Sequence, residues 1–510
     1  MTNMTRRNFI QSGTVASAAV MSAVVLPRHV LGGGGYVSPN DKINLGYVGC
    51  GIQGMRHMTM DILPNPHFRI TAVCDPNRIS EGYIGGRENN NWVRDLINDP
   101  HWAEDAKSAV CGREVGRYVT KQYYAQQSGG SPAAVALGEY LDFREMLETQ
   151  KDIDAVFCAT PDHLHGVVAM RAMRAGKHII SQKPMSNILD EARQLRDMSR
   201  KTDVATQLFC GVSYSKDAHL VGELLASGVI GTVHKVVCVL QGGGPGGMLN
   251  PTDTPPIPDG FDWNLWTGPA AERAYHPTYT HGVFRGWYDF GSGSLGDTGT
   301  YTFYQVFRAL GLASPPRNVQ ATRSEFGWTF SENGRSRQPG NASFPQASRV
   351  SWEFAHPAIT GATIDLHWYD GGITPPDDEW MAWAENGDSL LPPDGYILYF
   401  GSEGMILCDH MGGNPKWKRY PNRQEFVVPA LKSPFPIPEI EQFVKACRGE
   451  AKSEATFESA YLFNETILLG NIALRVPRKK LKWDSENFEF TNSDEANALK
   501  FRKNRPGWEL

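Results

Sequence analysis

The fold of this chain is decided by the stretch I-N-L-G-Y-V-G-C-G-I-Q-G, residues 43–54. The apolar run 43–48 has the composition of a buried strand, and it leads into glycines at 49, 51 and 54. Glycines at this spacing permit a tight turn, close approach of a phosphate group to the backbone, and close packing of the helix that follows. The stretch therefore predicts a strand, a phosphate-binding turn and a helix.

A second apolar run, residues 68–74, ends at Asp75. In a Rossmann domain, a carboxylate about 20 residues beyond the glycine turn accepts hydrogen bonds from ribose hydroxyls. Its charge favours NAD over NADP, although Arg78 lies close enough to soften that preference. We predict an NAD cofactor, with NADP possible. The predicted contacts in this region are Gly49, Gly51, Ile52, Gln53, Gly54, Asp75 and Pro76.

Strands and helices alternate along the first part of the chain, which is typical of a parallel sheet covered by helices on both faces. Further strands are expected at 154–159, 178–180 and 205–210, and helices at 139–149, 163–175 and 188–199. Residues 81–135 are predicted to form an insertion with helices at 87–98 and 103–117.

The pattern changes after about residue 211, where short strands stand between long Gly/Pro loops. This favours a second, α+β domain with a large, mostly antiparallel open sheet. Its strands are expected at 233–241, 350–354, 363–368, 397–401 and 404–407, and its helices at 439–448 and 456–474. The expected domains are 1–40 (signal and linker), 41–185 (Rossmann), 186–480 (substrate binding) and 481–510 (surface segment).

The sequence T-P-D-H-L-H, residues 160–165, follows one of the expected parallel strands. Ligands of doubly wound sheets bind at the carboxyl ends of strands. We therefore expect Thr160, Pro161, His163 and His165 to border the cofactor. His165 has two open interpretations, a substrate contact or a helix cap.

Two further clusters carry candidate chemistry. Lys183 ends a strand and precedes a proline, which disfavours helical backbone at the lysine. Next to a nicotinamide, its ammonium group could orient a hydroxyl or exchange its proton. Asp297 and Tyr301 lie one helical turn apart after a glycine-rich loop and could bind neighbouring sugar hydroxyls; the alternative is an N-capping aspartate with a rim tyrosine.

Composition excludes several classes of protein. The 510 residues are 41% hydrophobic and 21% charged, with a net charge of −5, which is ordinary for a globular protein of two or three domains. Lys and Arg are scattered, so no nucleic-acid partner is predicted. No metal site is predicted either, and a neutral carbohydrate or polyol substrate fits this charge balance.

The N-terminal residues match the pattern of an export signal. T-R-R-N-F-I, residues 5–10, precedes an Ala/Val-rich run at 13–26, as in twin-arginine signals. The run is too short for a membrane-spanning helix. We expect export through the twin-arginine pathway, to a periplasmic or periplasm-facing anchored location, and no transmembrane domain in the mature protein.

Several motifs together resemble the Gfo/Idh/MocA oxidoreductases, the glucose-fructose oxidoreductase and inositol dehydrogenase family. The family motifs are GCGIQG (49–54), CDP (74–76), ATPDHLH (159–165), AGKHIISQKP (175–184) and LGDTGTY (295–301). Three further stretches resemble the exported bacterial branch of the family: WNLWTGPA (263–270), FRGWYDFGSGSLGD (284–297) and WYDGGITPP (368–376). The resemblance implies a Rossmann domain, an open-sheet second domain and a homo-oligomer, dimer or tetramer.

The resemblance also implies roles for individual residues. Lys183, Asp297 and Tyr301 are the expected catalytic residues, and Lys183 is expected to contact the cofactor as well. The expected substrate contacts are Lys183, Arg285, Trp287, Asp297 and Tyr301. Two positions depart from the family pattern. Gln182 replaces the usual glutamate, and Tyr301 replaces the usual histidine. With an ordinary pKa near ~10 against ~6.5 for histidine, tyrosine is the poorer base at neutral pH.

Three functions remain open. The first is NAD(P)-dependent oxidation of a hydroxyl of a sugar, polyol or glycoside, with a tightly bound cofactor recycled in place. The second is redox-neutral, NAD-dependent cleavage of a glycosidic bond through a transient keto-sugar. The third is a non-catalytic sugar-binding protein.

Overall fold

A computed structural model of the chain describes residues 37–82, 86–211, 217–331, 334–339, 342–376, 383–385, 388–424, 426–427 and 437–510. The chain divides into two units, 1–42 and 43–510. In the first unit the structure describes only the short turn η1 (Pro39–Asp41) and its neighbours. The predicted export signal lies outside the described residues.

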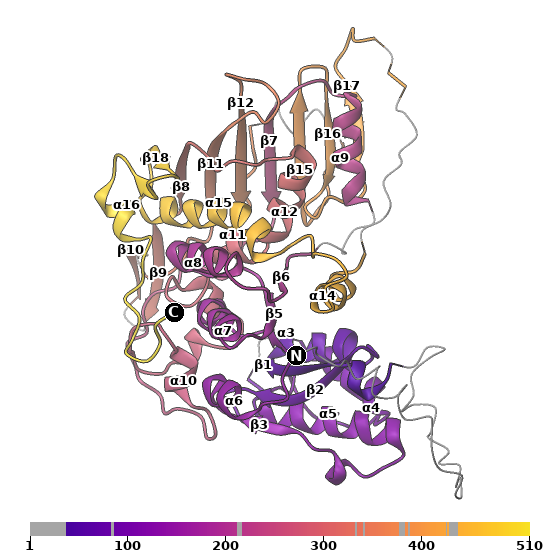
Figure 1. Cartoon of the computed structure of the whole chain (residues 1–510). Helices are drawn as coiled ribbons and strands as arrows, with labels where there is room; N and C mark the ends of the chain where they lie inside the picture. Colours follow the sequence, from indigo (N-terminus) through magenta and orange to yellow (C-terminus); the bar gives the residue numbers. More distant parts are fainter. Residues whose placement is uncertain are drawn as a thin grey trace, which may run out of the picture. The chain divides into compact units, whose positions relative to one another are not determined.

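The first half of the second unit is built on a six-stranded parallel sheet of order β3-β2-β1-β4-β5-β6 (Figure 1). This is the doubly wound order of Rossmann domains, and it confirms the predicted fold class. All four residues of β4 are buried, as expected for a strand covered on both faces. The strands are β1 (Ile43–Val48), β2 (Phe68–Cys74), β3 (Gly138–Tyr140), β4 (Ala155–Cys158), β5 (His178–Gln182) and β6 (Thr206–Phe209).

Helices connect these strands on both faces of the sheet. They are α3 (Ile52–His57), which continues into the π-helical turn η2 (Met58–Ile62), α4 (Asn89–Ile97), α5 (Arg113–Ser128), η3 (Pro132–Ala134), α6 (Phe143–Thr149), α7 (Asp162–Arg174) and α8 (Leu189–Ser199). The sheet also includes β6, which lies beyond the domain boundary expected at residue 185.

Two expected helices begin later than their sequence patterns suggested. The helix expected from residue 103 begins at Arg113, directly after Gly112, whose φ of +115° ends the preceding loop. The helix expected from residue 139 begins at Phe143. The residues before it form strand β3, and the Asp142 carboxylate caps the helix by accepting from the Arg144 backbone N–H at 2.8 Å.

The second half contains a nine-stranded sheet of order β17-β16-β15-β7-β12-β11-β8-β18-β19. Only its β7–β12 pair is parallel among the pairings described, so the prediction of a mostly antiparallel sheet is confirmed. The strands are β7 (Val233–Leu240), β8 (Asn318–Arg323), β11 (Ser348–Ala355), β12 (Thr363–Asp370), β15 (Gly395–Gly401), β16 (Gly404–Asp409), β17 (Lys416–Arg419), β18 (Leu481–Asp484) and β19 (Glu489–Phe490).

Helices α12 and α15 cross one face of this sheet (Figure 1) and bury large aromatic side chains there, among them Phe303, Trp352 and Trp368. The helices of this half are α9 (Ala218–Ser227), α10 (Trp263–Thr267), α11 (Gly293–Asp297), α12 (Gly299–Leu310), α14 (Glu439–Cys447), α15 (Phe457–Arg475) and α16 (Asp494–Ala498), with 3-10 turns η4 (Pro277–Tyr279) and η5 (Val283–Gly286). Two small hairpins complete it, β9 (Phe326–Ser331) with β10 (Gly334–Pro339), and β13 (Ala384–Glu385) with β14 (Asp388–Ser389).

The C-terminal segment differs from the polar surface wrap that we expected. It contributes β18, β19 and α16, and it buries Trp483 and Trp508. Its last residues return to the Rossmann half, where the Arg144 guanidinium donates to the Gly507 carbonyl at 3.0 Å.

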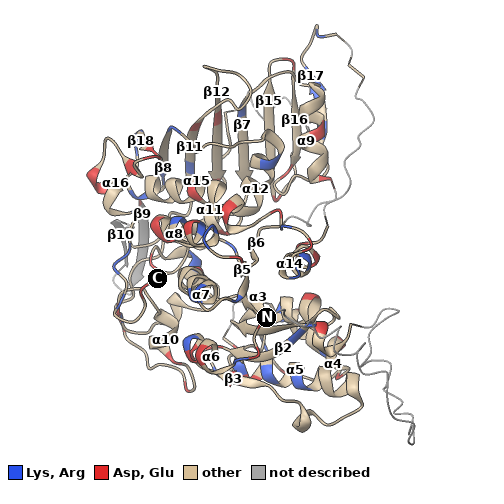
Figure 2. Cartoon of the chain, in the orientation of Figure 1, with Lys and Arg blue, Asp and Glu red and all other residues tan. Residues whose placement is uncertain are grey.

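Charge is distributed evenly over the described elements. Basic and acidic residues are interspersed on helices such as α8 and α14 (Figure 2). None of the described helices combines the length and the apolar character that crossing a membrane requires.

Candidate active site

The glycine turn has the geometry that its sequence predicted. Gly49 has a φ of +97°, a conformation that other residues rarely adopt. A Cβ there would lie 2.5 Å from the Ala159 carbonyl oxygen, and a Cβ on Gly54 would collide with the Gly49 carbonyl. These glycines let β1, α3 and the loop after β4 approach one another closely, at the point where the sheet order reverses.

Asp75 joins the end of β2 to this turn. One carboxylate oxygen accepts from the Cys50 backbone N–H at 2.7 Å, and the other accepts from the Asn77 N–H at 2.8 Å. Burial raises the pKa of this carboxyl, and the hydrogen bonds from Asn77 and Cys50 oppose that effect. A carboxylate acceptor is thus held beside the turn, where a ribose would lie.

A cavity of about 400 Å³ extends over the carboxyl ends of the parallel strands. Nine of the predicted residues line it: Gly49, Gly51, Ile52, Gln53, Asp75, Pro76, Thr160, Pro161 and Arg285. The remaining wall is largely apolar and includes Phe143, Leu164, Phe261, Leu265, Trp266 and Trp508. A glycine-rich turn, a carboxylate where a ribose would lie and an apolar wall together fit a bound NAD.

Lys183 and Asp297, predicted from separate segments, are in contact. The Lys183 ammonium donates to the Asp297 backbone carbonyl at 2.5 Å and forms an ion pair with its carboxylate. The lysine follows β5 and the aspartate ends α11, so the Rossmann half and the second half each supply one partner.

Arg285 adds a second positive charge, with its Nε 3.0 Å from the same Asp297 carboxylate oxygen. Burial alone would raise the pKa of Asp297, but the charges of Arg285 and Lys183 outweigh it and hold that pKa well below its ordinary value. Asp297 is therefore ionised at every pH at which the protein would work, and it serves to fix the two cations.

Tyr301 lies beside this cluster, its ring centre 4.9 Å from the Lys183 nitrogen. Burial, reinforced by the negative charge of Asp297, raises the pKa of the phenol well above its ordinary value. The phenol therefore stays protonated at neutral pH and can donate a hydrogen bond, whereas it cannot act as a base.

Of the predicted residues that do not line the cavity, three have structural positions. The His163 ring faces the backbone carbonyls of Trp266 at 2.8 Å and Phe290 at 3.2 Å, and burial lowers its pKa to about 3. The His165 ring lies between the carbonyls of Pro184 at 2.6 Å and Thr160 at 2.9 Å. Both histidines fasten neighbouring segments together.

Trp287, the third of these, is fully buried, and its indole N–H donates to the Thr278 carbonyl at 2.6 Å. It belongs to an aromatic cluster with Trp263, Trp266 and Phe290. The structure thus gives this tryptophan a packing position.

Two features of the site were missed in the sequence. Asp162 begins α7 and is 3% exposed; burial raises its pKa, while the nearby charges of Arg285, His165 and Lys183 lower it. The sequence offered a signal for this, since the aspartate lies within the D-H-L-H motif that we used only for its histidines.

The second missed feature is His57. Its Nε2 lies 2.8 Å from the Gln53 amide nitrogen and 3.0 Å from that of Gln182, and its Nδ1 contacts Asp61 at 2.6 Å. Gln182, which replaces the family glutamate, is thus tied to the helix of the glycine turn. Only the fold brings these residues together, since His57 and Gln182 are far apart in the sequence.

Comparison with known proteins supports the family resemblance in both halves. Residues 118–209 match the oxidoreductase-family model for the NAD-binding Rossmann fold, and residues 246–319 match that family's C-terminal alpha/beta domain. Both are models of the Gfo/Idh/MocA proteins. The first half is an NAD-binding Rossmann domain, as predicted.

Individual relatives are more distant. The chain is 25% identical over 248 residues to glycosyl hydrolase family 109 protein 2 of Shewanella sp. (strain ANA-3), covering 45% of this chain and 44% of that protein. It is 29% identical over 92 residues to levoglucosan dehydrogenase of Pseudarthrobacter phenanthrenivorans, covering 18% and 23%. The chain thus spans less than half the length of these curated relatives.

Among solved structures, the fold is similar to that of the WlbA dehydrogenase from Bordetella pertussis, crystallised with NADH and UDP-GlcNAcA. The TM-score is 0.51 at 15% sequence identity, covering 87% of this chain and 99% of that chain. At this identity the likeness concerns the fold alone.

Proposed function

We propose that the protein is a Gfo/Idh/MocA-type oxidoreductase that uses NAD to oxidise a hydroxyl of a sugar, polyol or glycoside. The observation that carries this proposal is the contact of Lys183 with Asp297 beside a cavity that fits the dinucleotide. NAD is preferred to NADP because the Asp75 carboxylate would face a 2′-phosphate of like charge.

When bound, NAD supplies the hydride acceptor for the carbon that bears the hydroxyl. Lys183, fixed by Asp297, binds the hydroxyl oxygen, releases one of its own protons to solvent and accepts the hydroxyl proton as the carbonyl forms. The Tyr301 hydroxyl is a second donor toward the same oxygen, since burial keeps it protonated. Arg285 holds Asp297 in place and can contact a further substrate hydroxyl.

Redox-neutral cleavage of a glycosidic bond is the second candidate, and the match to a glycosyl hydrolase family 109 protein favours it. In this scheme, oxidation of a ring hydroxyl acidifies the adjacent C–H. That proton leaves, the glycosidic C–O bond breaks with protonation of its oxygen, water adds to the resulting alkene, and the hydride returns to the ring carbon. Lys183 would stabilise the charge on the carbonyl oxygen in both directions.

The experiment that decides between the candidates uses the purified full-length chain and a panel of sugars, polyols and aryl glycosides. Accumulation of NADH with a ketone product supports the oxidoreductase. Release of aglycone without net NADH supports the redox-neutral enzyme. Tight sugar binding with neither product would contradict both and would indicate a non-catalytic binding protein.

Location and assembly are also proposals. The T-R-R-N-F-I segment supports export through the twin-arginine pathway to the periplasm, free or anchored. Replacing Arg6 and Arg7 by lysine should retain the protein in the cytoplasm, and unchanged export would refute the assignment. The family resemblance supports a homo-oligomer, dimer or tetramer, and a monomer in light scattering would refute it.

A further inference from the structure

The last residues of the chain reach the dinucleotide cavity. Trp508 is 5% exposed and lines that cavity together with Phe143 and Leu164. The centre of the Trp508 ring lies 6.1 Å from that of Phe143, and the Arg144 guanidinium lies 4.1 Å from the centre of the Trp508 ring. A side chain two residues from the C-terminus therefore forms part of a site built mainly by the Rossmann half.

The position of Trp508 along the sheet identifies the part of the dinucleotide that it would meet. Asp75, the ribose acceptor, follows β2, and Phe143 follows β3 at the edge of the sheet. Lys183 follows β5, on the other side of the β1–β4 reversal point. Trp508 thus lies at the adenosine end of the cavity, opposite the catalytic cluster.

The segment that carries Trp508 is fastened on several sides. Arg505 donates to the Asn264 carbonyl at 2.7 Å and to the Gly268 carbonyl at 2.7 Å, which anchors it to the end of α10. The Gly507 carbonyl accepts from Arg144 at 3.0 Å and from Arg171 at 3.1 Å. These bonds tie the tip of the chain to α6, α7 and α10.

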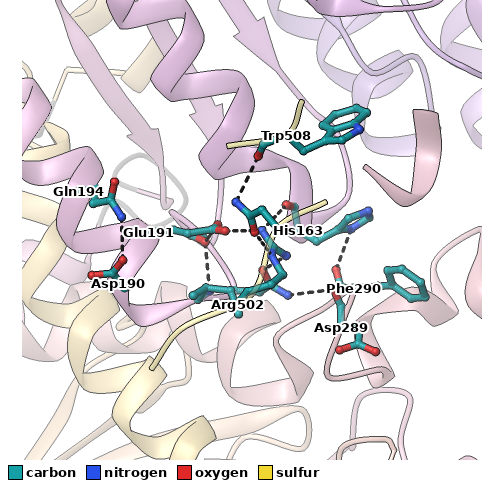
Figure 3. Close-up of polar contacts among 12 residues, drawn as sticks. His163, Asp190, Glu191, Gln194, Asp289, Phe290, Arg502 and Trp508 are labelled. Atoms are coloured by element: carbon teal, nitrogen blue, oxygen red, sulfur yellow. Dashed lines mark hydrogen bonds and ion pairs between the residues drawn. The ribbon is translucent and has the colours of Figure 1, made fainter. Parts of the chain in front are cut away.

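Arg502 anchors the same segment further along (Figure 3). It forms an ion pair with Glu191 of α8, in which both side chains are less than a tenth exposed, and it donates to the His163 carbonyl at 3.2 Å. Asn504, which accepts from Arg502, donates in turn to the Trp508 carbonyl at 3.2 Å. The Trp508 indole is directed away from this polar network (Figure 3).

We propose that Trp508 is a binding residue for the adenine ring of NAD and that the anchored residues 499–510 hold this side chain in position. The edge of the indole that reaches this apolar cavity offers the purine an apolar contact, and burial of such a contact is worth about threefold in affinity. The inference rests on NAD binding by the Rossmann half and adds a contact from the opposite end of the chain.

The test compares Trp508→Ala with Phe501→Ala, which removes a 51% exposed aromatic side chain from the same segment. Calorimetry should show NAD binding weakened about threefold in Trp508→Ala and unchanged in Phe501→Ala. NAD dissociation should be faster by a similar factor. Trp508→Phe, which keeps an aromatic ring, should recover most of the affinity. Equal NAD affinity in the wild type and Trp508→Ala would overturn the inference and leave the proposed function standing.

Fragments of the cofactor separate an adenine contact from general damage to the fold. AMP binding should weaken in Trp508→Ala, whereas binding of nicotinamide mononucleotide should not change. Equal weakening of both fragments would contradict the inference, since it would assign Trp508 a merely structural role. A wild type that binds no NAD at all would instead refute the proposed function.

A measurement on the wild-type protein is independent of whether the variants fold. An NAD analogue with an azido group on the adenine ring should, on illumination, label the C-terminal peptide that contains Trp508. Labelling confined to other peptides would overturn the assignment.

Discussion

The site has a dinucleotide end, which is the cavity, and a catalytic end, which is the charge cluster beside that cavity. The two ends hold their ligands by different physical means. At the dinucleotide end, the site consists of a glycine-rich turn with its backbone N–H groups, an apolar wall and the Asp75 carboxylate. At the catalytic end, Lys183, Arg285 and Asp297 form a buried cluster of charges. The dinucleotide end depends on the fit of the ligand to its surface, and the catalytic end depends on charge. A substitution at one end should therefore leave the function of the other end largely unchanged.

The largest expected effect is at the catalytic end. Lys183→Ala should lower kcat by about 10³-fold, in the range of a lost acid–base group, because the group that takes up the substrate's hydroxyl proton is removed. NAD affinity should change by less than about threefold, since Lys183 does not line the cavity. Steady-state kinetics and calorimetry measure the two quantities.

Lys201→Ala is the matched control, because Lys201 is an exposed lysine in the loop after α8. It should leave both quantities unchanged. If Lys183→Ala lost NAD binding together with turnover, the two ends would not be independent and the comparison would fail.

The next largest effect is expected on NAD affinity when a side chain is introduced into the glycine turn of the dinucleotide end. Gly49→Ala places a Cβ against the Ala159 carbonyl in a backbone conformation with φ of +97°. NAD affinity should fall at least about 10-fold, and unfolding free energy by about 1–3 kcal/mol. Calorimetry and denaturant titration measure these changes.

Gly176→Ala separates backbone strain from the steric effect. Gly176 also has positive φ, +69°, but a Cβ there would meet nothing within 4 Å. This variant should lose about 1 kcal/mol of stability and keep full NAD affinity. A loss of NAD affinity in this variant as large as in Gly49→Ala would refute the steric explanation.

A smaller effect concerns the single carboxylate near the ribose. Asp75→Asn should shift the preference for NAD over NADP by about 10-fold toward NADP, because a like charge near the 2′-phosphate is removed. Asp142→Asn is the control, since Asp142 also lines the cavity but caps α6. Competition binding measures the preference, and an identical shift in both variants would deny Asp75 its specific role.

The smallest expected effect concerns Glu465, a buried carboxyl group that lies outside both ends of the site. It shows how burial of an acidic group without a catalytic role affects stability. Burial raises the pKa of Glu465 in α15 to about 7, opposed by the hydrogen bond from Trp483. Because the folded state binds this proton more tightly than the unfolded state, stability falls as pH rises from about 4.5 through 7. Glu465→Gln should therefore be more stable than the wild type at pH 8, by about 2 kcal/mol.

Thermal unfolding across this pH window provides the measurement for Glu465→Gln. The control Glu458→Gln, an exposed position in the same helix, should follow the wild-type curve. A wild-type curve that rises through the same window would show that Glu465 is already ionised when folded.

The sequence predicted the dinucleotide end well because its parts are local. Each part follows a strand that the sequence shows as an apolar run; the parts are the turn at 49–54, Asp75 and the loop at 160–161. The order of the strands in the sheet brings the carboxyl ends of these strands together. Strand β3, by contrast, overlaps a stretch for which the sequence pattern predicts a helix. Its three residues carry little periodic signal, and its identity depends on pairing with β2.

The catalytic end was only partly predictable. Lys183, Asp297 and Tyr301 were found through motif resemblance, whereas the ion pairs among Lys183, Arg285 and Asp297 depend on contacts between distant segments. His163 and Trp287 show the reverse error, in which a conspicuous side chain proves to be buried and bonded to backbone carbonyls. Trp508 had no sequence signal, because the return of the C-terminus to the Rossmann half is a tertiary feature.

The most direct test of the central claim follows a labelled hydride. A panel of sugars and glycosides deuterated at the ring carbons is incubated with the wild type and with Lys183→Ala, and the dinucleotide is analysed by mass spectrometry. The account predicts that deuterium enters the nicotinamide ring in the wild type and does so far more slowly in Lys183→Ala, although both proteins bind NAD. Turnover of a substrate in which no deuterium ever reaches the dinucleotide would contradict it.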